Sequence, residues 1–267
     1  MSASVLGRIV ARTRERLHER LLQRPLDEML ATAPTPGTRR PFAEALGRDR
    51  LNVIAEFKRR SPSKGALRED LTPPAVAQAY EAGGAVALSV LTEEDFFGGH
   101  IGDLRQARAA TRLPTLRKDF VVDPYQVWEA WIAGADAVLL IVAALGEKDL
   151  RKLLDTTLEA GLDPLVEVHD EAELETALAC GARLVGVNNR DLSTLIVSLD
   201  TALRLAPHIP DDVVAVAESG ITTGADVRRL RAAGYDAFLV GEHFMTAPDP
   251  GEAVRSLLRD AAAERPA

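Results

Sequence analysis

The feature that most constrains this chain is a repeated unit, in which a helical pattern ends in a small residue and a glycine and is followed by a short apolar strand. The strands of the five units cover residues 86–90, 138–142, 165–168, 184–187 and 238–241. Glycine supplies the left-handed residue that ends a helix, and strands that are apolar throughout are buried on both faces. Strands that alternate with helices pair in parallel, because hairpins cannot join parallel neighbours.

Three further apolar runs bring the number of predicted strands to eight. They are Asn52–Lys58, Leu113–Asp119 and Val213–Glu218. Eight parallel strands close a (β/α)8 barrel, and 267 residues is a usual size for one such domain. The alternative is an open doubly wound sheet, but neither GxGxxG nor GxxxxGK[ST] follows a strand. We therefore predict an α/β protein with a TIM-barrel fold over residues 1–267.

Residues 1–48 precede the first strand and are predicted to pack on the barrel as an extension. Leu6, Ile9, Val10, Leu17 and Leu21 recur at helical spacing and predict an amphipathic helix. The proline-rich stretch 32–40 predicts a loop. The extension is thus expected to be part of the barrel domain and not a domain of its own.

Composition excludes several classes of partner. The chain carries 32 basic and 40 acidic side chains, a net charge of −8, which argues against binding to nucleic acid or to an anionic membrane surface. The longest apolar stretch, residues 132–145, is too short to span a membrane and contains Asp136. The single cysteine, Cys180, cannot form an intrachain disulfide, which favours a reducing, cytoplasmic location. We expect a monomer or a weak homo-oligomer.

Charged and polar side chains stand at the carboxyl ends of the predicted strands, where a barrel of this kind carries its chemistry. They are Glu56, Lys58, Lys118, Asp119, Glu167, Asn188, Asn189, Arg190, Glu218 and Ser219. Each alone could be a solvated strand end, but so many charges on one rim are tolerated only when they pair. Positive and negative side chains placed close together also shift one another's pKa values apart, so that one group can donate a proton while its neighbour accepts one. This predicts general acid/base chemistry. Lysines among the carboxylates would repel magnesium, so neither a metal nor another cofactor is expected.

Two glycines predict a phosphate site. Gly220 follows the seventh strand and Gly241 the eighth, where barrels often bind phosphate with backbone N–H groups and a short helix. The segment after Gly241 is compatible with that helix. Glycine also serves plain turn geometry, so position alone leaves both interpretations open. The expected ligand is a phosphorylated, anionic small molecule.

Several strings resemble the indole-3-glycerol phosphate synthase family. They are IAEFKRRSPSKG, LSVLTEEDFFGGH, LRKDFVVDPYQV, LVEVHDEAEL, GVNNRDL, VAESGI and VGEHFM. They occur in the order found in that family, and the resemblance extends from about residue 5 to residue 256. The resemblance implies a barrel whose amino-terminal extension helps to bind substrate. It also implies conversion of 1-(2-carboxyphenylamino)-1-deoxyribulose 5-phosphate to indole-3-glycerol phosphate, with release of carbon dioxide and water.

The same resemblance implies roles for the charged residues. Lys118 would be the general acid for the ketone oxygen, and Glu167 would accept or relay the proton in the dehydration. Lys58 would hold substrate anions and assist proton transfer, while Glu56 would orient the lysines.

The remaining residues of the set match positions that hold the substrate or its intermediates. Asn188 and Glu218 would hold the intermediates, and Ser219 would add a donor to the phosphate glycines. Arg190 and Ser61 would address the anionic groups of the substrate.

The chain departs from the family pattern at His100, His243 and Thr246, which bears on the loop after the second strand and on phosphate binding. His169 is interpreted as a loop or packing residue, and Cys180 as a core thiol.

Two other functions stay open. Phosphoribosylanthranilate isomerase, the nearest enzyme alternative, resembles a barrel with a cysteine and an aspartate as its acid and base, and the first strand here carries Glu56 and Lys58 with no cysteine. A barrel that binds a sugar phosphate without catalysis is the second alternative. The S-x-x-K string at Ser61 lacks the companion motifs of serine hydrolases.

Overall fold

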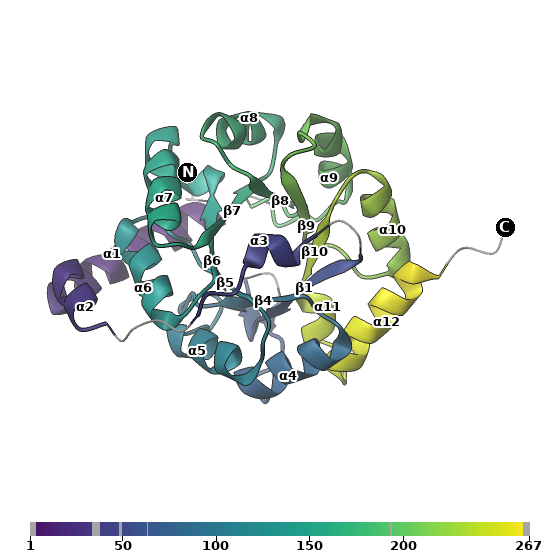
Figure 1. Ribbon diagram of the computed structural model, residues 1–267, viewed down its shortest axis with the longest axis horizontal. Coiled ribbons are helices and arrows are strands. Elements are labelled where there is room, and N and C mark those ends of the chain that lie inside the picture. Colours follow the sequence, from purple (N-terminus) through teal and green to yellow (C-terminus); the bar gives the residue numbers. More distant parts are fainter. Residues whose placement is uncertain (1–3, 34–37, 48–49, 63, 193, 264–267) are drawn as a thin grey trace.

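Eight parallel strands close into a barrel in the computed structural model, which describes residues 4–33, 38–47, 50–62, 64–192 and 194–263 (Figure 1). The barrel strands are β1 Asn52–Phe57, β4 Ala87–Leu91, β5 Thr115–Lys118, β6 Ala137–Ile141, β7 Asp163–Val168, β8 Leu184–Asn188, β9 Val214–Glu218 and β10 Ala237–Val240. Each strand pairs with its predecessor in this list, and β1 pairs with β10 to close the ring. The predicted fold class and all eight predicted strands are confirmed.

Helices cover the outside of the barrel and alternate with its strands. They are α4 Pro73–Gly83, α5 Ile101–Ala110, α6 Pro124–Ala133, α7 Glu147–Glu159, α8 Glu171–Ala179, α9 Asp200–Leu205, α10 Gly224–Ala232, α11 Glu242–Met245 and α12 Pro250–Ala262, with short 3₁₀ helices at Val142–Ala144 and Ala206–His208. The repeat glycines that follow the helices all adopt left-handed φ, from 70° at Gly161 to 112° at Gly234. This is the conformation that the sequence pattern required.

The barrel interior is filled by apolar side chains below the level of the charged residues. Ile54, Leu116, Leu139, Leu165 and Leu239 belong to this inner cluster and are at most 4% exposed. A second, larger cluster lies between the strands and the surrounding helices. The interior is therefore a packed core below the charged residues, and a cavity lies above it, at the carboxyl end of the strands.

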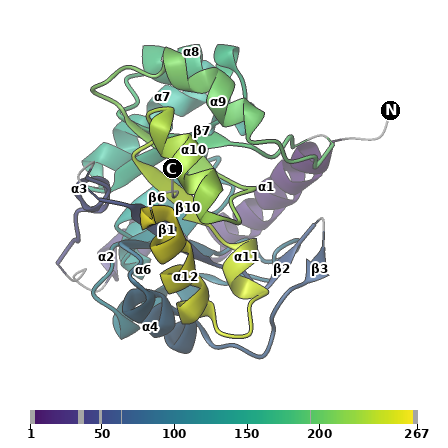
Figure 2. The same ribbon diagram turned by 90° about the vertical axis from the view of Figure 1, so that its right-hand side faces the viewer.

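The segment before β1 contacts both ends of the barrel. It contains α1 Val5–Gln23, α2 Leu26–Ala31 and α3 Phe42–Ala45. At the amino end of the strands, Phe42 and Leu46 are fully buried, and the amides of Phe42 and Ala43 donate to the Asp163 carboxylate at the start of β7. Figure 2 shows α1 at the opposite end, beside the loops that follow the strands.

Ionic contacts attach α1 to those loops. Arg12 and Arg16 pair with Asp95 in the loop after β4, and Ile9 joins the inner cluster. Residues 34–37 of the predicted loop at 32–40 lie outside the described residues.

A small hairpin after β1 was not predicted. Its strands are β2 Arg60–Ser61 and β3 Gly65–Ala66, and they pair antiparallel. The hairpin lies at the carboxyl end of the barrel (Figure 2). Within the described part of the chain, no helix is both long enough and apolar enough to cross a membrane.

Candidate active site

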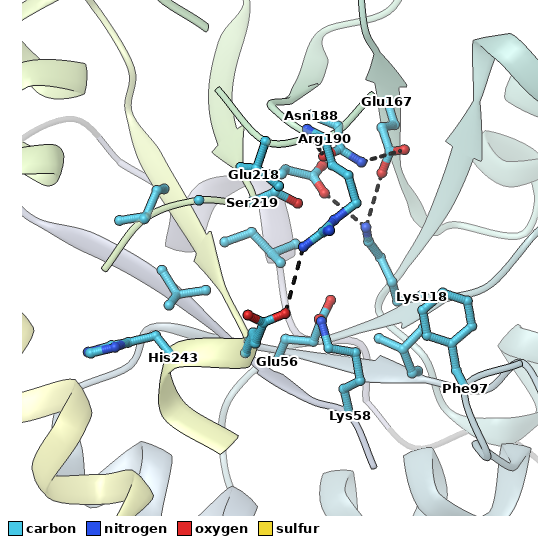
Figure 3. A pocket seen from close by; sticks show the side chains of 18 of the residues that line it. Glu56, Lys58, Phe97, Lys118, Glu167, Asn188, Arg190, Glu218, Ser219 and His243 are labelled. Carbon is cyan, nitrogen blue, oxygen red and sulfur yellow. Dashed lines mark hydrogen bonds and ion pairs between the residues drawn. The ribbon is translucent and has the colours of Figure 1, made fainter. Parts of the chain in front are cut away.

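A cavity of about 390 Å³ opens at the carboxyl end of the strands, and most of the site residues predicted from the sequence line it. Every residue to which the sequence assigned a catalytic or substrate-binding role lines it except Ser61: Glu56, Lys58, Lys118, Glu167, Asn188, Arg190, Glu218, Ser219, Gly220 and Gly241. Figure 3 shows the side chains of Glu56, Lys118, Glu167, Asn188 and Glu218 converging from β1, β5, β7, β8 and β9. Leu139, Ile141 and Leu239 form part of its apolar lining.

Lys118 is the centre of the cavity. Its Nζ lies 3.0 Å from Oε2 of Glu167 and 2.9 Å from Oε2 of Glu218 (Figure 3). Burial alone would lower the pKa of Lys118, but the two carboxylates outweigh it and raise the pKa above its usual value. The ammonium form is thus the stable one.

The two carboxylates around Lys118 differ in their surroundings. Burial raises the pKa of each, but at Glu167 this is outweighed by Lys118, by His169 and by the amide of Asn188, which donates at 3.1 Å, so that the pKa falls well below its usual value. At Glu218, burial and the neighbouring Glu167 prevail over Lys118 and raise the pKa to about 7. The site therefore holds one carboxylate that stays ionised and one that titrates near neutrality.

Glu56 and Lys58 form a second ion pair on the floor of the cavity. Glu56 lies on β1 and Lys58 follows the strand directly, so that the two residues are two positions apart and their side chains share a face. Lys58 Nζ lies 2.9 Å from Glu56 Oε1. Ser89 of β4 donates to the other oxygen of Glu56 at 3.3 Å. Burial raises the pKa of Glu56, but Lys58 and Lys118 reverse this, and the pKa is lower than usual.

The segment after β8 places Asn188 and Arg190 over the cavity. The Asn188 side chain joins the two, because its Nδ2 donates to Glu167 while its Oδ1 accepts from the Arg190 backbone N–H at 3.0 Å. Figure 3 shows the Arg190 guanidinium reaching across the cavity. Its Nη2 lies 3.7 Å from Oε2 of Glu242. Asn189 turns away from the cavity and donates to the backbone of β9.

Ser219, Gly220 and Gly241 form the opposite wall. Ser219 and Gly220 both adopt left-handed φ, 65° and 79°. For serine this conformation is strained, and such strain concentrates at functional sites. His243 and Thr246 follow Gly241 and also line the cavity.

Ser61 lies elsewhere. It lines a smaller cavity of about 80 Å³ beside the first, together with Val5, Leu6 and Ile9 of α1. Its Oγ accepts from the Lys64 backbone N–H at 3.2 Å, within the β2–β3 turn. Lys64 is the residue of this turn that reaches the main cavity, where its ammonium pairs with Glu242 at 2.6 Å.

Two neighbours of these residues also bear on the site. His169 was interpreted as a loop or packing residue, but its Nε2 lies 3.4 Å from Oε1 of Glu167. The signal was its position two residues beyond Glu167 at the end of β7. Asp119 also lines the cavity, yet its carboxylate is bound by the buried Arg117 and by Thr92.

The departure at His100 has a local explanation. His100 precedes α5, and its Nδ1 accepts from the Gly102 backbone N–H at 3.0 Å as a helix N-cap. A serine at this position could accept the same hydrogen bond. Among the residues that the structure describes, no group of three His, Cys, Asp or Glu side chains is placed to hold a metal ion.

Known proteins resemble this chain in sequence and in fold. The family model described as indole-3-glycerol phosphate synthase matches residues 6–257. A protein named indole-3-glycerol phosphate synthase from Polaromonas naphthalenivorans strain CJ2 is 47% identical over 259 residues, which cover 96% of this chain and 98% of that protein.

Solved structures show the same fold at low identity. A 3-hexulose-6-phosphate synthase from Salmonella typhimurium superposes with a TM-score of 0.61 at 14% identity, over 78% of this chain and 97% of that one. A thiamine phosphate pyrophosphorylase from Pyrococcus furiosus gives a TM-score of 0.59 at 18% identity, over 79% and 96% of the two chains. At this identity, the likeness concerns the barrel alone.

Proposed function

The chain belongs to the indole-3-glycerol phosphate synthase family, and we propose that it acts as a carbon–carbon lyase of that kind. Its substrate would be 1-(2-carboxyphenylamino)-1-deoxyribulose 5-phosphate. The products would be indole-3-glycerol phosphate, carbon dioxide and water. The observation that carries this proposal is the Lys118 ammonium, held between Glu167 and Glu218 at the base of a cavity of suitable size.

Lys118 would act first, as the general acid of ring closure. The aromatic carbon that bears the carboxylate attacks the ketone carbon, and the ketone oxygen gains negative charge as the new carbon–carbon bond forms. An ammonium group aimed into the cavity can protonate that oxygen, which becomes a hydroxyl group. Loss of carbon dioxide then restores the aromatic ring.

The carboxylates would serve the dehydration that follows. The new hydroxyl group leaves as water, and the neighbouring methylene carbon loses a proton, so that an acid and a base are needed in one small space. Glu167 lies on one side of Lys118 and Glu56 with Lys58 on the other side of the cavity floor. We assign the proton from the methylene carbon to Glu167, with Glu56 orienting the two lysines.

The phosphate would bind at the wall formed after β9 and β10. Backbone N–H groups at Gly220 and Gly241, with the Ser219 hydroxyl, are suited to phosphate oxygens. Arg190 and Lys58 bring positive charge to the same cavity, and Ser61 would act through the β2–β3 turn that it stabilises.

The isomerase alternative is not supported by the position of the one cysteine. Cys180 follows α8, and its thiol contacts the Glu147 carbonyl oxygen at 3.8 Å. It is not among the residues that line the cavity.

Turnover of the carboxyphenylamino substrate by the purified protein tests the proposal. Formation of the indole ring gives a rise in near-ultraviolet absorbance and in fluorescence, which is followed in time. The matched control is Lys118→Ala at the same concentration, which should give a rise at least about a hundredfold slower. Absence of product with the unaltered protein, together with turnover of phosphoribosylanthranilate, would overturn the proposal in favour of the isomerase.

A further inference from the structure

His169 lies directly behind the proposed catalytic carboxylate and is held there by a second carboxylate. The residue follows β7 and precedes Asp170, the N-cap of α8. Its Nδ1 lies 2.9 Å from Oε2 of Glu173, and its backbone N–H donates to the same oxygen at 2.8 Å. Its Nε2 points to Glu167, 3.4 Å from Oε1. The imidazole is therefore sandwiched between two carboxylates.

Both contacts favour the charged imidazolium. A carboxylate can only accept, so the Nδ1 contact with Glu173 places a proton on Nδ1. Among the described residues, Nε2 has no aligned hydrogen-bond acceptor, and the ion pair with Glu167 is the interaction that it makes. Burial opposes the charge, but Glu167 and Glu173 outweigh it and raise the pKa of His169 to about 10.

The charged groups around His169 form a chain that leads to Lys118. Glu173 of α8 contacts one ring nitrogen and Glu167 of β7 the other. Lys118 of β5 binds the remaining oxygen of Glu167, and Glu218 of β9 lies beyond Lys118. Each carboxylate oxygen of Glu167 thus faces a different cation, while Asn188 of β8 adds a neutral donor.

We propose that His169 is a positioning residue of the reaction. Glu173 holds the His169 imidazolium in place, and the imidazolium fixes the Glu167 carboxylate and balances part of its negative charge, while Lys118 balances the rest. The inference rests on the proposed function. A cation on the far oxygen of Glu167 weakens the attraction between Glu167 and Lys118, and this lets Lys118 release its proton more readily. The same cation keeps Glu167 ionised in acid. His169 itself does not line the cavity, so we place it behind the residues that would contact the substrate.

A purely structural role is the competing explanation, and the start of α8 offers a control for it. Asp170 caps the helix by accepting from the Glu173 backbone N–H at 2.9 Å. Asp170→Ala weakens this start of the helix and leaves both carboxylates that contact the imidazole. A loss of activity that comes only from a loosened helix would therefore appear in Asp170→Ala as well.

The kinetic test compares His169→Gln with Asp170→Ala. Glutamine keeps a polar group but no charge, so we expect kcat to fall about tenfold with KM within about twofold, and the acid limb of the kcat–pH profile to move up by about one pH unit. Glu173→Gln should move the profile in the same direction, and Asp170→Ala should leave the limb in place. An unchanged limb in both His169→Gln and Glu173→Gln would overturn the proposal.

A second measurement does not depend on turnover or on a folded variant. The side-chain ¹⁵N resonances of His169, assigned through contacts to α8, report the charge on the ring directly. We expect an imidazolium up to about pH 8 in the unaltered protein. A neutral ring at about pH 7 would refute the inference, whereas an imidazolium in a protein that makes no indole would refute the proposed function alone.

Discussion

Replacing Glu218 with glutamine tests the electrostatics of the cavity, because the change removes an ionisable group and keeps its shape. The Glu218 side chain is 1% exposed and binds Lys118 through Oε2 alone. Its Oε1 is buried and has no hydrogen-bond partner among the described residues. It fits beside β8 because Gly186 carries no Cβ, which would overlap that oxygen. A glutamine side chain can occupy the same space.

The size of the effect follows from the pKa of Glu218. Burial and Glu167 raise this pKa from 4.5 to about 7 in the folded protein. The folded state therefore binds more protons than the unfolded state between these pH values. The contribution of Glu218 to the free energy of unfolding is fully present below about pH 4.5 and is lost as the pH rises to about 7. At 1.36 kcal/mol for each pKa unit, the loss is roughly 3 kcal/mol. Glutamine does not ionise, so the variant avoids the loss.

Thermal unfolding at about pH 5 and about pH 8 measures this difference. With an unfolding entropy of about 2.1 cal/mol/K per residue, roughly 3 kcal/mol corresponds to about 5 °C in Tm for a chain of 267 residues. We expect Glu218→Gln to gain about 5 °C relative to the unaltered protein between the two pH values. Glu159→Gln, at an exposed position at the end of α7, is the matched control. A Tm difference that is equal at both pH values would show that Glu218 does not titrate near neutrality.

Three further substitutions address catalysis and phosphate binding. Lys118→Ala should lower kcat by about 10²–10⁴-fold with little change in KM, since a proton donor acts in the transition state; normal kinetics would remove Lys118 from the mechanism. Glu167→Gln should slow ring closure or dehydration in single-turnover experiments, and an unchanged rate constant would exclude a proton role. Glu242→Gln should lower the inhibition constant of inorganic phosphate several-fold, because the Glu242 carboxylate pairs with Lys64 and Arg190 at the phosphate wall; equal inhibition would place the phosphate elsewhere.

The fold was predictable because its determinants are local. Each repeat glycine ends a helix in the left-handed conformation, and each following strand is apolar on both faces, so that every unit of the pattern specifies its own geometry. Parallel pairing then places the carboxyl ends of all strands on one rim. That rule alone brought Lys118 and Glu167 together across 49 residues of sequence.

The features that were missed depend on contacts between distant segments. Phe42 and Leu46 are ordinary apolar residues in sequence, and only the closed barrel makes them the cover of its amino end. Ser61 follows Glu56 and Lys58 closely in sequence, but it belongs to the β2–β3 hairpin, and its side chain lines the neighbouring, smaller cavity. The partners of His169 lie two residues before it, at the end of β7, and four residues after it, in the first turn of α8. Neither the strand period of two nor the helix period of about 3.6 relates all three residues, so their contact could not be predicted from spacing.

The two carboxylates that share Lys118 do not do the same work, because their free oxygens differ. Oε1 of Glu167 faces His169 and Asn188, so Glu167 stays ionised, whereas Oε1 of Glu218 has no hydrogen-bond partner among the described residues. Below about pH 7 Glu218 is neutral, and Lys118 then has one adjacent ionised carboxylate in place of two, which would make it a stronger acid for the proposed ring closure. Above that pH Glu218 is ionised and strengthens the hold on the Lys118 proton. The protonation of Glu218 therefore sets the acidity of its neighbour, and a site with two equivalent glutamates would lack this control.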